Sequence, residues 1–427
     1  MPDRKLELGI ALACVQACLL STTALAQTLT PEQLKPTKNV GVLERSRPEY
    51  DAKGINLGAF ILSPSLDVDG TYDDNIYATQ TSPVDDAIVQ SRAKLALRSI
   101  WTERSINLFA TTDYSDYTKN NDESNFNWTG GGGTSLTVTK RLKVKLSGDY
   151  GSLHESREDS SSPPNTIHPI AFNQADGDAS VGIDLYPVAL SVEGKYTKYN
   201  YHSGELPNGT IVPQDYRDNA VWMYTGKADV AVTADTAIFI EARQSRWQYD
   251  QRPPVTPIDR DSVTDELLVG AQFDLTNLMR GEVAVGGFRE RFSDPNERKQ
   301  TGLAVDGKVE WYATQLTTVV LDFSRQTAAS EVAGTSAYVG TAASVEVDHE
   351  LLRNVILSGH FAYDAENYSG IDRNDHRYIV GAGASWLLNR YANLNLSYDH
   401  RDRTSRGLMS GEDYAKNVVT LGLQLKI

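Results

Sequence analysis

Apolar and polar residues alternate along most of this 427-residue chain. Between residues 62 and 72 one parity is apolar or small and the other is polar: Leu62, Pro64, Leu66, Val68, Gly70 and Tyr72 against Ser63, Ser65, Asp67, Asp69 and Thr71. A period of two predicts a strand with one apolar and one polar face. The same alternation recurs in residues 89–101, 142–152, 177–185, 303–311, 392–398 and 419–427. Past the N-terminal region, only residues 30–34 suggest even a short helix.

The alternating segments are long and numerous. We count about eighteen strands, most of them roughly nine to thirteen residues in length. Strands of soluble sheets average about five or six residues, whereas a strand that crosses a membrane at a tilt near 45° needs about 9–11. The lengths therefore favour strands that span a bilayer.

Long and short connections alternate between the predicted strands. The longer ones are residues 73–86, 119–124, 154–173, 201–217, 250–261, 293–298, 327–335, 366–375 and 402–413. The short ones are residues 102–105, 140–141, 187–188, 233–235, 275–279, 312–315, 351–353 and 389–390. This alternation is typical of outer-membrane barrels, which have short periplasmic turns and longer extracellular loops.

The hydrocarbon core of a membrane requires the predicted sheet to be closed. In hydrocarbon every backbone N–H and C=O needs a partner inside the protein, so only helices and closed barrels can cross. We therefore predict an all-β fold: a transmembrane antiparallel up-and-down β-barrel of about eighteen strands. The last alternating segment, residues 419–427, is expected to close the barrel against the first strand. An even strand count places both termini on the periplasmic side.

Aromatic residues gather at the predicted strand ends, as expected at membrane–water interfaces. Those expected near the loops are Tyr72, Tyr114, Tyr150, Tyr196, Phe323, Tyr363 and Tyr398. Those expected near the turns are Trp101, Tyr186, Trp311 and Trp386.

The N-terminal region has the pattern of a secretory signal peptide. Arg4 and Lys5 precede an apolar run that ends in Ala24-Leu25-Ala26, which matches an A-x-A cleavage site. We predict three parts: a signal peptide over residues 1–26, a periplasmic segment over 27–56 and the barrel over 57–427. The segment 27–56 could be a flexible lead-in, a plug or a docking arm, and a flexible lead-in is the simplest interpretation.

Both cysteines of the chain, Cys14 and Cys18, fall within the predicted signal peptide, so the mature protein would have neither a disulfide nor a thiolate site. A cysteine-free exported protein of this size fits the Gram-negative envelope. The predicted location is the cell outer membrane, after cleavage near Ala26.

Several stretches resemble a known family. They are "RPEYDAKGINLGAFILSPSLDVDGTYDDNIYAT" (47–79), "GAQFDLTNLMRGEVAVG" (270–286), "VDHELLRNVILSG" (347–359) and the terminal "NVVTLGLQLKI". They are similar to the proteobacterial outer-membrane barrels called putative β-barrel porin type 2, and the likeness covers nearly all of the mature chain. The resemblance implies an outer-membrane barrel. Members of that family are often associated with loci for the export or assembly of surface polysaccharide. The terminal Ile427 departs from the aromatic residue that commonly ends the assembly signal of such barrels.

The polar parity of each strand is predicted to face the lumen. The candidate lumen-lining residues are Asp67, Asp69, Arg92, Lys94, Arg98, Lys143, Lys145, Glu193, Lys195, Glu241, Arg243, Asp306, Lys308 and Glu310. Barrels of 16–18 strands enclose an aqueous channel in which such charges stay hydrated. Their mixed signs argue against a strong filter for one ion sign. A polar interior plugged by loops remains an equal alternative.

Other chemistries are less well supported. In "LDVDGTYDDN" (66–75) the carboxylates of Asp67 and Asp69 share one face of a strand and no closing glutamate follows, unlike a calcium loop. "WTGGGGTSL" (128–136) lacks the lysine and the helix of a phosphate loop. No G-x-S-x-G or H-E-x-x-H motif accompanies the histidines. We therefore predict no enzyme activity, no metal and no cofactor.

The formal net charge of −15 is spread along the chain without a basic stripe, which argues against a nucleic-acid partner. The expected partners are outer-membrane lipid, the barrel-assembly machinery that inserts such proteins and periplasmic polysaccharide-export proteins.

Three functions follow from these features. The first is a porin-like channel for the passage or export of polar solutes or surface polysaccharide. The second is a non-conducting structural or assembly barrel that partners with polysaccharide machinery. The third, an outer-membrane hydrolase, has the least support from the motifs.

Overall fold

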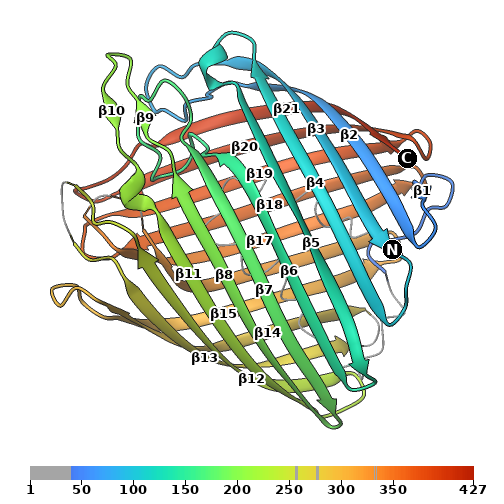
Figure 1. Cartoon of the computed structure of the whole chain (residues 1–427). Helices are drawn as coiled ribbons and strands as arrows, with labels where there is room; N and C mark the ends of the chain where they lie inside the picture. Colours follow the sequence, from blue (N-terminus) through green and yellow to red (C-terminus); the bar gives the residue numbers. More distant parts are fainter. Residues whose placement is uncertain (1–39, 255–257, 276–277, 331, 333) are drawn as a thin grey trace.

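The protein folds into a closed antiparallel barrel (Figure 1). A computed structural model describes residues 40–254, 258–275, 278–330, 332 and 334–427, so the predicted signal peptide and residues 27–39 lie outside the described residues. Within them, eighteen long strands form the wall: β2 (Phe60–Asp73), β3 (Asp86–Ser99), β4 (Arg104–Tyr117), β5 (Asn125–Thr139), β6 (Leu142–His154), β7 (Ala171–Leu185), β8 (Val188–Tyr201), β11 (Asn219–Ala231), β12 (Thr236–Tyr249), β13 (Ser262–Leu275), β14 (Met279–Phe292), β15 (Gln300–Thr314), β16 (Thr317–Ala329), β17 (Ala337–Leu352), β18 (Val355–Tyr368), β19 (Asn374–Leu387), β20 (Ala392–Arg406) and β21 (Tyr414–Lys426).

Smaller elements lie outside the wall. β1 (Ile55–Asn56) pairs with β2 at the end that lies near the short turns, where Ile55 is opposite Leu62. β9 (Gly204–Glu205) pairs with β10 (Ile211–Val212) in the loop between β8 and β11. Two short 3₁₀ turns, η2 (Asn121–Glu123) and η3 (Asp215–Arg217), lie in loops at the same end of the barrel. No helix in the described part of the chain is long and apolar enough to cross a membrane.

The last strand closes the barrel against the first, which confirms the predicted seam. β21 runs antiparallel to β2 from the Ser65–Lys426 pair to the Asp73–Val418 pair. The hydroxyls of Thr71 and Thr420 lie 3.0 Å apart across this seam, on its inner face. Every other wall strand pairs with its neighbours in the chain order, so the up-and-down topology is confirmed as well.

The alternation in the sequence corresponds to the outer and inner faces of the barrel wall. On β2 the apolar Leu66 and Val68 are each 39% exposed, whereas Thr71 and Asp73 are only 8% and 7% exposed. The exposed apolar residues form the lipid-facing surface and the polar parity faces the interior. The wall strands are 13 to 16 residues long, more than the nine to thirteen predicted for most of them. They continue past the apolar band, and their polar ends show no alternation that the sequence could reveal.

The strands are strongly tilted with respect to the barrel axis. From Val305 on β15, the directly paired residues lead through Val285, Val269, Ile240, Ala228, Leu190 and Ile183 to Leu142, beside a tight turn. In the other direction they lead through Arg325, Thr341, Ala365 and His376 to Thr404, close to a loop. A row of paired residues therefore climbs from the turn end to the loop end, as strand tilt in a barrel requires.

The aromatic belts are present in part as predicted. Tyr72, Tyr114 and Tyr398 are exposed near the loop end, and Tyr186, Trp311 and Trp386 near the turn end. The placement of Phe323 near the loops was wrong. Phe323 lies in the middle of β16, opposite Gly307, and its ring occupies the space where a Cβ of that glycine would be.

Candidate functional site in the barrel interior

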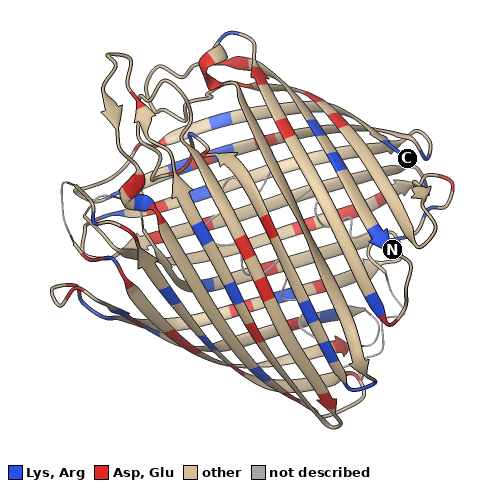
Figure 2. Ribbon diagram, viewed as in Figure 1, with Lys and Arg blue, Asp and Glu red and all other residues tan. Residues whose placement is uncertain are grey.

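Charged residues occur along the strands over the height of the barrel (Figure 2). The alternation of exposed and less exposed positions places many of them on the inner face. The curvature of the wall brings distant strands together on this face. Lys227 on β11 contacts Glu282 on β14, three strands away, at 2.7 Å from Nζ to Oε1. Such a contact is possible only across the concave side of a barrel. It fixes the polar parity of these strands as the inner one.

The structure places all the predicted lumen-lining residues on the inner parity of their strands. It joins several of them. Arg243 contacts Glu241 on its own strand and Asp306 on β15, the latter at 3.0 Å. Arg92 pairs with Asp113, Lys195 with Asp176, Lys308 with Asp322, and Glu310 with Arg280. Lys94, Arg98, Lys143, Lys145 and Glu193 lie on the same inner face, on β3, β6 and β8. That these residues line a water-filled path stays a prediction.

Asp67 and Asp69 have the positions that the alternation predicts. Asp67 lies opposite Arg92 on β3 and Gln424 on β21, and Asp69 lies opposite Gln90 and Gly422. Both side chains point to the interior along an extended strand. Within the described ranges, no three His, Cys, Asp or Glu side chains come together in a group that could hold a metal ion.

One half of the inner wall is strongly acidic, which the sequence analysis missed. The inner positions of β12–β18 hold the carboxylates Glu241, Glu266, Asp274, Glu282, Glu290, Asp306, Glu310, Asp322, Glu346, Asp348, Glu350, Asp364 and Glu366. The same positions hold only three Lys or Arg side chains, those of Arg243, Arg280 and Lys308. The excess becomes visible only when each strand is assigned its parity and its place in the ring.

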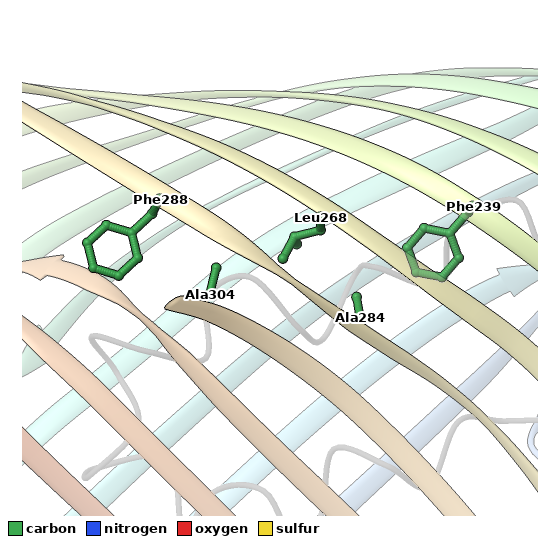
Figure 3. Packing of buried hydrophobic residues seen from close by; sticks show 5 residues of the cluster. All are labelled: Phe239, Leu268, Ala284, Phe288 and Ala304. Atoms are coloured by element: carbon green, nitrogen blue, oxygen red, sulfur yellow. The ribbon is translucent and has the colours of Figure 1, made fainter. Parts of the chain in front are cut away.

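An apolar cluster interrupts this polar surface. Phe239, Leu268, Ala284, Phe288 and Ala304 occupy inner positions on β12–β15 and pack together (Figure 3). Val339 from β17 packs against them, and the Lys227 ammonium lies 3.8 Å from the centre of the Phe239 ring. The interior is therefore not uniformly polar. Phe239 and Phe288 follow the polar parity of their strands, so simple alternation could indicate their inward direction.

At the extracellular end, the loop 155–170 reaches across the barrel to the opposite wall. Its ends join β6 and β7, and it contacts β18, β20 and β21. Glu158 is its anchor: its Oε1 accepts from Arg401 at 2.9 Å and from Lys416 at 2.8 Å. Tyr414 donates its hydroxyl to the other carboxylate oxygen at 3.4 Å. We call Glu158 with Arg401, Tyr414 and Lys416 the loop latch.

The loop latch is electrostatically strong. Burial opposes ionisation of Glu158, but Lys416 and Arg401 outweigh it and lower the pKa of this carboxyl to about 2. A second contact continues the latch, because Ser160 of the loop lies 3.2 Å from the Tyr368 hydroxyl. The segment "SLHESREDSSS" carries no local signal for this role, since its partners lie more than 200 residues away.

Further ion pairs connect the loops at the extracellular end. Arg157 reaches Glu123 of η2 with two nitrogens, at 2.7 and 2.9 Å. Arg217 of η3 is 1% exposed and pairs with Glu155. The extracellular mouth is therefore covered by loops that are connected through buried ion pairs.

At the periplasmic end, residues 40–54 lie against the inner wall. Val42 is 1% exposed and packs with Ile356 and Leu387, while its N–H donates to the Thr318 hydroxyl at 2.9 Å. Arg47 is fully buried and donates to Glu350 at 2.7 Å.

Residues 41–47 of the predicted segment 27–56 are packed, so the interpretation as a flexible lead-in does not hold for them. Their partners lie on β16–β19, and nothing in the local sequence pointed to those strands.

The histidines have separate partners. His360 lies 3.0 Å from Asp399, whereas His349 lies 3.0 Å from the Thr317 hydroxyl. His154 and His400 contact the amides of Asn127 and Asn417. An acid and a hydroxyl are thus not joined through one of these rings, as a Ser–His–Asp arrangement would require.

Comparison with known proteins supports the barrel class. The sequence pattern of a family described as "Putative beta-barrel porin 2" matches residues 47–427. The comparison with curated proteins gives no match.

Solved structures give weak similarities. The outer membrane protein OpdK from Pseudomonas aeruginosa is 11% identical, with 86% of this chain and 99% of that chain covered and a TM-score of 0.45. A BenF-like porin from Pseudomonas fluorescens Pf-5 is 10% identical, with 86% and 99% covered and a TM-score of 0.44. At these values the likeness assigns no function to this chain.

The loop latch can be tested by removing its charge. Glu158→Gln should release the loop 155–170, because Arg401 and Lys416 lose the loop carboxylate that they share and keep the wall residues Asp399 and Asp73. The expected loss is up to about 3 kcal/mol, the lower end for a broken buried pair. Protease cleavage within the loop should become faster. Asp159→Asn is the matched control, since the Asp159 side chain accepts hydrogen bonds from Ser161 of its own loop. Equal cleavage in both variants would contradict the latch.

The same latch predicts a pH dependence. A carboxylate with a lowered pKa contributes stability above its unfolded value near 4.3 and loses it as the pH falls through the folded value of about 2. Loop protection in the unmodified protein should stay constant from pH 7 to about 4.5 and fall below it. In Glu158→Gln the protection should be weak throughout and should lack this transition.

The periplasmic segment can be tested with a thiol probe. Val42→Cys should react slowly with a maleimide, because the position is buried. Adding Glu350→Gln removes the partner of Arg45 and Arg47 and should speed the reaction at least tenfold. Ser46→Cys, which is exposed, serves as the control and should react rapidly in both backgrounds. Fast labelling of Val42→Cys alone would show that the segment does not pack as described.

Proposed function

Because the chain belongs to the Putative beta-barrel porin 2 family, we propose that it is an outer-membrane channel that conducts small polar solutes and prefers cations. The observation that carries the proposal is the continuous set of inward charges over the height of the barrel. Ionised side chains at membrane depth are costly unless water or a partner reaches them. An eighteen-stranded barrel has room for that water.

The cation preference follows from the acidic half of the wall. Carboxylates exceed Lys and Arg on the inner face of β12–β18, and a field of one sign raises the local concentration of ions of the opposite sign. This replaces the expectation that mixed signs would prevent selectivity. Basic residues line β3 and β6, where Arg92, Lys94 and Lys143 lie, so the two signs are separated around the ring.

The covered ends limit what could pass. The loop 155–170 crosses one mouth, and residues 40–54 take up room along the inner wall at the other, so both leave less space for a polymer. These contacts favour small solutes over a surface polysaccharide. They also support a second candidate, a non-conducting barrel that acts through its loops and its N-terminal segment on envelope machinery.

The proposal also includes secretion with cleavage near Ala26, insertion by the barrel-assembly machinery and a periplasmic polysaccharide-export partner. The separate histidine partners give a hydrolase no support.

Planar bilayers distinguish the two candidates. The purified protein should give single-channel currents, and a salt gradient should give a reversal potential of the sign expected for cations. Replacing Glu346 and Asp348 with Gln and Asn should lower the preference, since both lie on the inner face of β17. Gln90→Glu/Asn107→Asp, which adds acid to the inner face of β3 and β4, should raise it. Silent bilayers with the folded protein, including its Glu158→Gln form, would favour the non-conducting barrel.

A further inference from the structure

The outer surface has a basic patch at the loop end of one sector. Arg246 on β12, Arg289 on β14 and Arg325 on β16 lie on the outward parity, next to exposed Leu267 and Leu303. We define these three arginines as the outer basic patch. It belongs to the same sector whose inner face is acidic, so its charge is not a continuation of the interior.

The pairing places the patch at the upper edge of the lipid-facing band. The outward row of Leu267, Gly287 and Leu303 is apolar. The next row towards the loops contains Gln244, Asp265, Arg289 and Thr301, and Arg246 lies one row further up. The surface therefore changes from apolar to charged within two rows.

The strand tilt brings the three arginines to a similar height. Rows climb from β6 towards β20, so Arg325, which shares a row with Val285, lies above that valine. Arg246 shares a row with Arg291 and lies below it for the same reason. Both shifts move Arg246 and Arg325 towards the level of Arg289 on β14.

Two of the three guanidinium groups are available to a ligand. Two neighbouring cations already have ion pairs: the Arg291 guanidinium lies 2.6 Å from the Asp265 carboxylate, and the Lys198 ammonium lies 2.6 Å from the Asp250 carboxylate. In the described part of the chain, Arg246 and Arg289 have no carboxylate within ion-pair distance, and both are exposed. Arg325 donates to the Thr341 hydroxyl and keeps its remaining donors. On the other side of the barrel the outward loop-end positions hold residues such as Tyr398 and Tyr72 instead.

We propose that the outer basic patch binds the phosphorylated headgroup of an outer-leaflet glycolipid, whose acyl chains lie on the apolar rows below it. The loop end faces the outer leaflet in this class of barrel. Arg246 and Arg289 stand two strands and one row apart, about 12 Å from Cα to Cα at the usual strand spacing and rise. That separation suits two phosphates on one sugar headgroup better than the single phosphate of a phospholipid. Guanidinium groups are well matched to phosphate oxygens.

Native mass spectrometry of the detergent-purified protein tests the proposal. The probes are bisphosphorylated lipid A, the same lipid A without its phosphates, and phosphatidylglycerol. The unmodified protein should retain the bisphosphorylated form preferentially. Arg246→Gln/Arg289→Gln/Arg325→Gln should lower its retention by roughly tenfold or more, since each basic residue near an anionic lipid surface contributes about fivefold.

The matched control removes three charges from the turn end. Arg104→Gln/Lys140→Gln/Arg141→Gln leaves the outer basic patch intact and should retain lipid A as the unmodified protein does. Folding of each variant is checked by its heat-dependent mobility on a gel. Equal retention by both triple variants, or of lipid A with and without phosphate, would overturn the proposal. Phosphatidylglycerol bound as tightly as lipid A at the same arginines would also overturn it, because the patch would then select anionic lipid in general. Conductance plays no part in this readout, so the result is independent of the proposed channel.

Discussion

The pairing of β21 with β2 is the contact on which the rest of the structure depends. In hydrocarbon no water is present to form hydrogen bonds with an unpaired backbone N–H or C=O. A sheet is therefore stable there only when it has no free edge strand. Once this seam closes, each strand has one face towards lipid and one towards the interior. The alternation of single residues then becomes a division of the whole molecule. Leu66 and Asp67 are adjacent in the chain but lie on opposite faces of the wall.

The sequence was sufficient for the features that depend on this division. Period-two alternation, strand length and alternating connectors indicated the barrel, its strand number, the closing strand and the inward direction of residues such as Asp67 and Arg243. It was insufficient wherever two distant segments meet. Glu158 and Lys416 are far apart in the chain, and no pattern near either residue indicates the other. The packing of Val42 against Ile356 and Leu387 could not be inferred for the same reason. Phe323 was misplaced because the predicted loop began at residue 327, whereas β16 continues to Ala329 and Phe323 lies in its middle.

The ring of strands is electrically asymmetric, and this asymmetry has consequences on both faces. Inside β12–β18 the acidic side chains exceed the basic ones, which supports a preference for cations. Outside the same sector, three arginines border the apolar band. When the charges are only summed along the sequence, the two faces are not distinguished and the result is a net charge of −15. Assignment of each strand's parity separates the two faces, and our two proposals concern one face each: the inner face and permeating ions, the outer face and the lipid.

The most direct test of the central claim is a cross-link at the seam. Thr71 and Thr420 lie opposite each other on β2 and β21, with their hydroxyls 3.0 Å apart, and the only cysteines of the chain are Cys14 and Cys18 in the predicted signal peptide. Thr71→Cys/Thr420→Cys should therefore form a disulfide within one molecule on oxidation in outer membranes, seen as a reducible shift in gel mobility. The pair Thr71→Cys/Ser324→Cys, on the inner faces of β2 and β16, should not form one. Failure of the seam pair to cross-link, or cross-links only between molecules, would contradict a closed barrel.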